Sequence, residues 1–181
     1  MLEKDIERVL VSETEIDAIC KRLGAQITKD YAGQKPLIVG LLKGCMPFMA
    51  GLIKHIDLYC EIELMGVSSY HGGISSSADI KITKDLEISV KDRHILIAED
   101  IVDTGKTLDV IVKLLYHRGA ASVDVVTLLD KPAGRVLEFV PKYVGTVIPS
   151  VGLLARTERY YDEMYRNLPY VGVLKPAVYK K

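Results

Sequence analysis

Residues 95–108 read ILIAEDIVDTGKTL, and this stretch decides the fold. Its opening apolar run is typical of a strand that is buried on both faces of a parallel sheet. Two adjacent acids, Glu99 and Asp100, follow the run, and Asp-Thr-Gly-Lys-Thr comes next, where the chain is expected to turn into a helix. A buried strand that passes through a glycine turn into a helix is the basic unit of α/β proteins.

The segments around this stretch repeat the alternation of strands and helices. Ser12 and Glu15 form a capping-box signature, which predicts a helix over 13–29. Apolar and alternating runs predict strands at 37–42, 61–68, 80–84, 94–99 and 122–130, with further helices from about residue 46 and around 110–115. We therefore expect a doubly wound, mostly parallel sheet flanked by helices, with ligands beyond the carboxyl ends of the strands.

Length and composition narrow the class of protein. A chain of 181 residues fits one α/β domain, residues 1–181. Lysine plus arginine and aspartate plus glutamate both number 24, so no overall basic field favours nucleic acid or a membrane surface. No apolar run approaches the roughly 20 residues of a membrane helix. Three scattered cysteines suit a reducing compartment, the cytoplasm, and four dispersed histidines show no zinc-ligand spacing.

The Gly105-Lys106-Thr107 sequence could belong to a nucleotide-binding P-loop, so we tested that pattern first. The pattern G-x-x-x-x-G-K-[ST] requires a glycine at position 100, where this chain has an aspartate. A carboxylate at that position would repel the phosphates that such a loop wraps. The sequence therefore argues against a P-loop ATPase or kinase.

The stretch instead divides into two halves with different partners. Residues 103–107 lie where a strand gives way to a helix, so backbone N–H groups and the helix dipole can converge on one phosphate. The hydroxyls of Thr104 and Thr107 add donors. Glu99 and Asp100 suit the vicinal hydroxyls of a ribose and a hard cation such as Mg²⁺. Together the two halves predict a ribose 5-phosphate ligand.

These residues resemble a known signature. ILIAEDIVDTGKTL is similar to the phosphoribosyl-pyrophosphate motif of type I phosphoribosyltransferases. The stretches VGLLKGCMPFMAGLI, VSSYHGG, IKITKD, TLLDKPAGR and YRNLPYVGVLKP, in that order along the chain, resemble the bacterial hypoxanthine (hypoxanthine-guanine) phosphoribosyltransferases over nearly the whole length. The resemblance implies the type I phosphoribosyltransferase fold, with a small hood formed by the chain ends.

The resemblance also implies a function in purine salvage. Such an enzyme transfers ribosyl 5-phosphate from phosphoribosyl pyrophosphate to hypoxanthine, and to guanine, giving IMP or GMP and pyrophosphate. It implies Mg²⁺ as the cofactor and a homodimer or homotetramer as the assembly, with neither nucleic acid nor membrane as a partner. The protein would therefore be a cytoplasmic glycosyltransferase.

Each motif implies roles for particular residues. Glu99 and Asp100 would bind the ribose and the metal, and Asp103 would be the general base for the purine N7 proton. The 5′-phosphate would be bound by Asp103, Thr104, Gly105, Lys106 and Thr107. Lys43, Gly44 and Arg166 would bind pyrophosphate, with a cis peptide before Lys43. Lys131 would donate to the purine 6-oxo group, Leu153 would contact the base, and Ser69 and Tyr70 would belong to a closing flap.

The resemblance breaks between residues 149 and 161. This chain reads PSVGLLARTERYY, where the family carries P-D-x-F-V-V-G-Y-G-L-D-Y. Gly152 occupies the expected place of the aromatic that stacks on the purine, and the place of a family aspartate falls near Arg159 or Tyr160. Two hypotheses remain open, a compensated reading-frame error and a real change in base recognition. The second predicts weak or altered purine binding.

The same residues are also compatible with other functions. A phosphoribosyltransferase with altered base specificity would keep the ribose-phosphate half of the site. A regulatory module would keep the phosphoribosyl-pyrophosphate site but bind nucleic acid; zero net charge and the presence of Lys43, Arg166 and a flap argue against it. Locally, Asp103 could serve only as a helix N-cap, and the two acids could simply end a strand in solvent.

Overall fold

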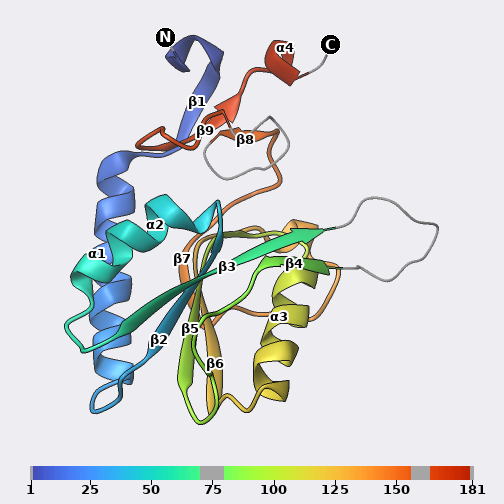
Figure 1. The fold of residues 1–181 in the computed structure, drawn as a ribbon. Coiled ribbons are helices and arrows are strands. Elements are labelled where there is room, and N and C mark those ends of the chain that lie inside the picture. Colours follow the sequence, from blue (N-terminus) through green and yellow to red (C-terminus); the bar gives the residue numbers. More distant parts are fainter. Residues whose placement is uncertain (1, 70–79, 156–163, 180–181) are drawn as a thin grey trace.

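The computed structural model describes residues 2–69, 80–155 and 164–179, and Figure 1 shows their arrangement. A six-stranded sheet in the order β4-β3-β2-β5-β6-β7 forms the body of the molecule. Its strands are β2 (Leu37–Leu42), β3 (Glu61–Ser69), β4 (Ile80–Lys84), β5 (His94–Val102), β6 (Ser122–Asp130) and β7 (Tyr143–Val147). Within the described residues of this sheet, β3 and β4 pair antiparallel and every other neighbouring pair is parallel, which confirms the predicted mostly parallel sheet.

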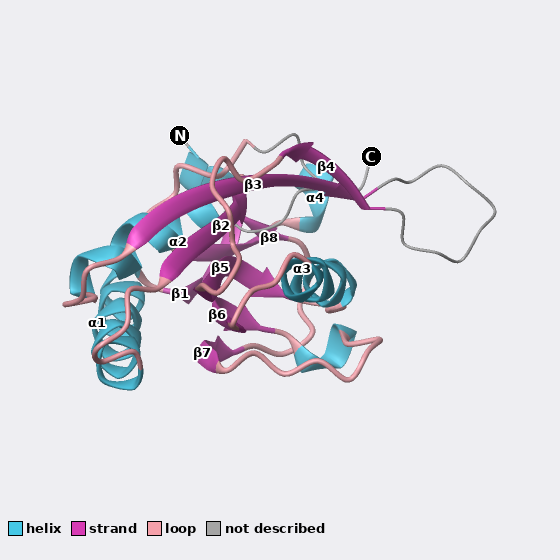
Figure 2. Cartoon of the chain, turned by 60° about the horizontal axis from the view of Figure 1, so that its bottom comes forward, coloured by secondary structure: helices cyan, strands magenta, loops and turns pink. Residues whose placement is uncertain are grey.

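Helices cover both faces of this sheet, as Figure 2 shows. The first face carries α1 (Glu13–Asp30) and α2 (Cys45–Leu52), which continues into η2 (Ile53–His55), and the other face carries α3 (Lys106–His117). Successive side chains of β2 point into the apolar cores on opposite faces of the sheet, because side chains alternate along a strand. Ile38 belongs to the core under α1 and α2, whereas Leu37 and Val39 belong to the core under α3. Burial on both faces explains why the run LIVGLL is apolar throughout.

A second, three-stranded sheet forms the hood. Its order is β1-β9-β8, with β1 (Ile6–Val11) and β8 (Leu154–Ala155) both antiparallel to β9 (Val171–Leu174). The short elements η1 (Leu2–Asp5) and α4 (Pro176–Tyr179) flank it. Figure 1 shows this sheet and both ends of the chain on the same side of the main sheet. The predicted hood of chain ends is therefore confirmed.

Several predicted boundaries agree with the structure and others do not. The capping box at the start of α1 is present, with the Glu15 N–H donating to Oγ of Ser12 over 3.3 Å. The predicted end of β5 at Glu99 is wrong, because Ile101 pairs with Leu129 of β6 and the strand continues to Val102. The acids thus lie within the strand. Strands β1, β7 and β9 were not predicted, since their short runs are fixed by pairing with distant segments.

None of the helices in the described ranges is long and apolar enough to cross a membrane.

Candidate active site

The site lies at the carboxyl edge of the main sheet, where the strand order reverses. β2 comes first among these strands in the sequence, and β3 and β5 flank it on opposite sides. Loops diverge from such a point and leave a crevice that commonly binds ligands. A cavity of about 210 Å³ opens there. The predicted site residues that line it are Lys43, Gly44, Glu99, Asp100, Asp103, Thr104, Gly105, Thr107 and Arg166.

The turn after β2 forms one side of the cavity. The Leu42–Lys43 peptide is cis, as the resemblance implied. Gly44 is the N-cap of α2, and a Cβ on it would lie 2.4 Å from Oδ2 of Asp100. Such a distance is far inside van der Waals contact, so the close approach of α2 to Asp100 requires a glycine. Lys43 itself is exposed at the rim.

Glu99 and Asp100 lie in the middle of the cavity wall. Asp100 is 5% exposed, and its Oδ2 is 3.2 Å from Nη1 of Arg166. The Ile101 N–H donates to Oδ1 of Asp100 over 2.9 Å, and the Asp100 N–H donates to Oε1 of Glu99 over 3.1 Å. The alternative in which both acids end a strand in solvent is therefore wrong.

The electrostatics of this acid pair follow from its burial. Desolvation raises the pKa of Glu99 well above its ordinary value of 4.5, and the adjacent Asp100 raises it further. Desolvation also raises the pKa of Asp100, against the lowering effects of its contacts with Glu99 and Arg166. Two carboxyl groups that share a buried site retain a proton to a higher pH than an exposed carboxyl would. A divalent cation would relieve the same repulsion.

The phosphate loop, residues 103–107, joins β5 to α3. Gly105 has a φ of 81° and is the N-cap of α3, so Asp103 does not serve as that cap. The first N–H groups of a helix have no intrahelical partner and attract anions. Thr104 and Thr107 line the cavity beside these groups, whereas Lys106, the first residue of α3, does not line it. The start of α3 therefore lies at the cavity with the geometry from which a phosphate site was predicted, and the phosphate-binding role itself stays a prediction.

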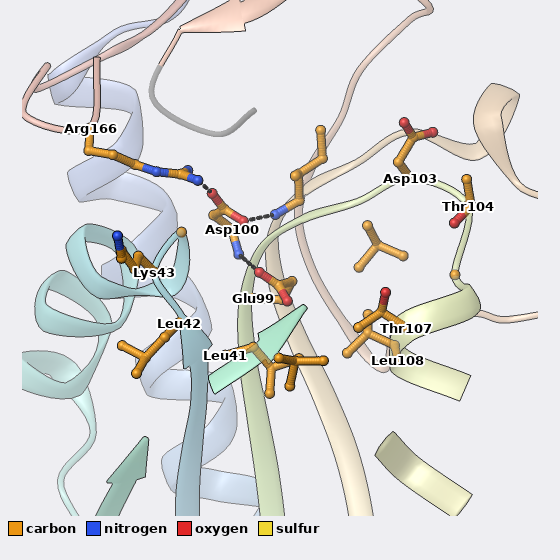
Figure 3. Close-up of a pocket in the computed structure, with 15 residues that line it drawn as sticks. Leu41, Leu42, Lys43, Glu99, Asp100, Asp103, Thr104, Thr107, Leu108 and Arg166 are labelled. Atoms are coloured by element: carbon orange, nitrogen blue, oxygen red, sulfur yellow. Dashed lines mark hydrogen bonds and ion pairs between the residues drawn. The ribbon is translucent and has the colours of Figure 1, made fainter. Parts of the chain in front are cut away.

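Asp103 and Lys131 meet beside the phosphate loop. Nζ of Lys131 lies 3.3 Å from Oδ2 of Asp103, although the two residues are far apart in the sequence. The Lys131 side chain is 13% exposed and that of Asp103 is 43% exposed, so the aspartate remains accessible from the cavity. Figure 3 shows Asp103 and Thr104 across the cavity from Lys43 and Arg166. The predicted base and the predicted 6-oxo donor are therefore neighbours.

Some predicted residues are not brought to this cavity. Leu153 precedes β8 and packs against the hood core, and it does not line the cavity. Ser69 ends β3, while Tyr70 and the expected aspartate position near Arg159 or Tyr160 lie outside the described residues. The predicted roles of these residues stay predictions.

Other cavity residues were not singled out from the sequence. Leu41, Val67 and Leu108 form part of its apolar wall. Their apolar character identifies them only as core residues, so the sequence carries no separate signal for a role in the site. The motif TLLDKPAGR predicted no role for Arg135. In the structure the side chain of Arg135 packs against the phosphate loop.

The arrangement can bind an anion at each end and a diol between them. The helix start and two threonines suit a phosphate, and Lys43 and Arg166 supply cations on the other side. Among the described residues no group of three or more His, Cys, Asp or Glu side chains is placed so that it could hold a metal ion. Mg²⁺ commonly takes one or two carboxylates and completes its coordination with substrate phosphates and water. Glu99 and Asp100 fit that pattern.

Comparisons with known proteins agree with this geometry. A family model described as "phosphoribosyl transferase domain" matches residues 12–153. Hypoxanthine-guanine phosphoribosyltransferase from Lactococcus lactis subsp. lactis is 54% identical over 99% of this chain and 97% of its own length. The Bacillus subtilis protein of the same name is 51% identical over 99% of both chains. The crystal structure of a Staphylococcus aureus hypoxanthine phosphoribosyltransferase, 48% identical, superposes with a TM-score of 0.93 over 99% of this chain and 97% of that one.

Proposed function

Because the chain belongs to the phosphoribosyl transferase family, we propose that it transfers ribosyl 5-phosphate from phosphoribosyl pyrophosphate to hypoxanthine or guanine in purine salvage. The products are IMP or GMP and pyrophosphate. The observation that carries the proposal is that the start of α3, the adjacent acids Glu99 and Asp100, and Arg166 all line one cavity. Relatives of about 50% identity over the full chain carry the same activity in their names.

We assign the chemistry to named groups. The bond from C1′ to the pyrophosphate oxygen breaks while a bond from C1′ to purine N9 forms, and the purine gives its N7 proton to Asp103. Lys43, Gly44 and Arg166 hold the leaving pyrophosphate, and residues 103–107 hold the 5′-phosphate. Lys131 donates to the 6-oxo group, which favours hypoxanthine and guanine over adenine.

Glu99 and Asp100 hold the ribose hydroxyls and, in this proposal, Mg²⁺. The fit is supported by the buried carboxyl group of Asp100 and the partly buried one of Glu99, whose pKa values are both raised. A cation held by these two carboxylates would supply positive charge beside the diphosphate. Among the described residues no third His, Cys, Asp or Glu side chain joins these two carboxylates in a group that could hold a metal, so the remaining ligands would be substrate oxygens and water.

A substrate panel tests the proposal. The protein is mixed with phosphoribosyl pyrophosphate, Mg²⁺ and one purine at a time, and release of pyrophosphate is followed. Hypoxanthine and guanine should turn over, while adenine should not. Absence of turnover with every purine would contradict the proposed function. A normal Michaelis constant for hypoxanthine would contradict the hypothesis that the divergent segment 150–160 weakens purine binding.

We further propose a homodimer or homotetramer in the cytoplasm, with neither nucleic acid nor membrane as a partner. The three free cysteines of the described chain support a reducing compartment. Light scattering after size-exclusion chromatography measures the assembly directly. A strictly monomeric protein at micromolar concentration would contradict this assignment. The regulatory and altered-specificity alternatives are not favoured by the names of the relatives.

A further inference from the structure

Residues 131–139 fold back over the phosphate loop and form what we call the collar. At its start, the Lys131 N–H donates to the carbonyl of Val102 over 2.9 Å. Further along, the Val136 N–H donates to the carbonyl of Thr104 over 3.2 Å. Between these two hydrogen bonds lies η3 (Pro132–Gly134). The collar is therefore tied by backbone bonds to both ends of the turn that carries Asp103.

Arg135 is the charged centre of the collar. Its side chain is only 12% exposed and forms an ion pair with Asp130, the last residue of β6, which is 13% exposed. Its Nη1 also donates to the carbonyl of Phe139 over 2.7 Å. The planar guanidinium can serve two acceptors in fixed directions at once. One side chain thus joins the end of β6 to the far end of the collar.

The same side chain packs directly against the phosphate loop. A Cβ on Gly105 would lie 3.2 Å from Cδ of Arg135 and 3.2 Å from Cβ of Phe139. Gly105 also has a φ of 81°, a conformation that side-chain-bearing residues rarely adopt. The collar therefore packs against the turn at Gly105, which leads into the free N–H groups at the start of α3. Arg135 does not itself line the cavity.

We infer that Arg135 is a positioning residue that holds the phosphate loop, through the collar, in register with Lys131 and Asp103. The inference rests on the proposed function, because it assigns the geometry of the 5′-phosphate and base subsites to one buried ion pair. Arg135 acts through backbone it holds in place, and a displacement of about 1 Å in such backbone is enough to cost a large factor in catalysis. Both substrates should be affected, since the collar contains Lys131, which is assigned to the base, and packs against Gly105 of the loop that is assigned to the 5′-phosphate.

The test is steady-state kinetics of Arg135→Met with phosphoribosyl pyrophosphate and hypoxanthine. We expect the Michaelis constants for both substrates to rise, that for phosphoribosyl pyrophosphate about tenfold. A merely structural role gives a different result, because a partly unfolded population lowers the apparent kcat and leaves the Michaelis constants of the folded enzyme unchanged. Unchanged constants with reduced kcat would overturn the inference.

Arg93→Met is the matched control. Arg93 also pairs with a carboxylate, Glu61, at 2.9 Å, but at the amino-terminal ends of β3 and β5, away from the cavity. Its loss should lower stability without changing either Michaelis constant.

Arg135→Lys covers the case in which Arg135→Met does not fold. A lysine keeps the charge beside Asp130 but cannot hold the Phe139 carbonyl with the same fork, so a smaller rise in both constants is expected. Normal constants in this variant would also overturn the inference. Failure of the wild-type protein to turn over hypoxanthine contradicts the proposed function, whereas wild-type turnover with normal constants in the variants contradicts the inference alone.

Discussion

Nη1 of Arg166 lies 3.2 Å from Oδ2 of Asp100, although 66 positions separate the two residues in the sequence. Arg166 is proposed to bind pyrophosphate and Asp100 to bind the ribose hydroxyls. The two ends of the proposed substrate site are therefore linked by an ion pair. In the proposed complex, the diphosphate would compete with Asp100 for this guanidinium.

The first prediction concerns this pair. Arg166→Gln removes a charge-assisted contact to the diphosphate, so the Michaelis constant for phosphoribosyl pyrophosphate should rise at least about tenfold. It also removes the cation that lowers the pKa of Asp100, so the acidic limb of the pH profile should move to higher pH. Initial-rate kinetics across pH measure both effects. Arg118→Gln, which breaks a surface pair with Asp85, is the control and should change neither.

A second prediction links stability to pH through Glu99. Between the ordinary pKa of 4.5 and its raised value in the fold, the folded protein holds a proton that the unfolded chain has released. Raising the pH through this window therefore removes stability. Glu99→Gln has no carboxylate to deprotonate, so above the window it should unfold with a free energy about 1 kcal/mol larger than the wild type.

Urea unfolding at several pH values measures the effect of Glu99→Gln. The difference in unfolding free energy between the variant and the wild type should vanish below the ordinary pKa of glutamate. The variant should also lose most of its activity. A variant that is less stable than the wild type at neutral pH would contradict the assigned cost of burying this carboxylate.

Gly44→Ala tests the close approach of α2 to the acid pair. The new methyl group would lie 2.4 Å from Asp100, whose carboxylate is held by Arg166 and by the Ile101 N–H. Asp100 or α2 must shift, and we expect kcat/KM to fall about a hundredfold. Gly33→Ala is the control, because, apart from its own chain neighbours, no atom of the described residues lies within 4 Å of its Cβ position. It should lower stability through its positive φ but leave the kinetics unchanged.

Asp103→Asn separates proton transfer from binding. An asparagine keeps the shape and the neighbouring Lys131 but cannot accept the purine N7 proton. The kcat should fall by about 10²–10⁴, while the dissociation constant of phosphoribosyl pyrophosphate changes little. Calorimetric titration and rapid-quench kinetics measure the two quantities. Equal losses in both would argue for a purely structural role of Asp103.

The cysteines provide a chemical probe of the site. Burial raises the pKa of the Cys45 thiol to about 12, and the charges of Glu99 and Asp100 contribute. At pH 8 this thiol is almost entirely protonated, and the thiolate is the reactive form. Iodoacetamide should therefore modify the partly exposed Cys60 before Cys45, which peptide mass spectrometry can follow. If Cys45 were labelled as fast as Cys60, the burial of Cys45 at the start of α2 would be contradicted.

Much of this fold could be predicted because its signals are local. β6 and β4 have the predicted bounds, since alternating and uniformly apolar runs depend only on which faces are buried. The phosphate loop was also predicted locally, because a strand, a glycine turn and a helix start follow one another within a few residues. The end of β5 was missed because Ile101 and Val102 continue the ladder past two acids, and only the pairing with β6 reveals that.

By itself the sequence determined the strand and helix pattern, the phosphate loop and the acid pair, which are all encoded by neighbouring residues. The tertiary structure alone decided which distant residues are in contact. Arg166 pairs with Asp100, and Lys131 pairs with Asp103. Arg135 packs against Gly105. These contacts join separate segments: those of Lys131 and Arg135 depend on how the parallel strands β5 and β6 align their carboxyl ends, and that of Arg166 depends on where the segment before β9 lies. No local pattern encodes that alignment, because it is set by the packing of the whole sheet against its helices.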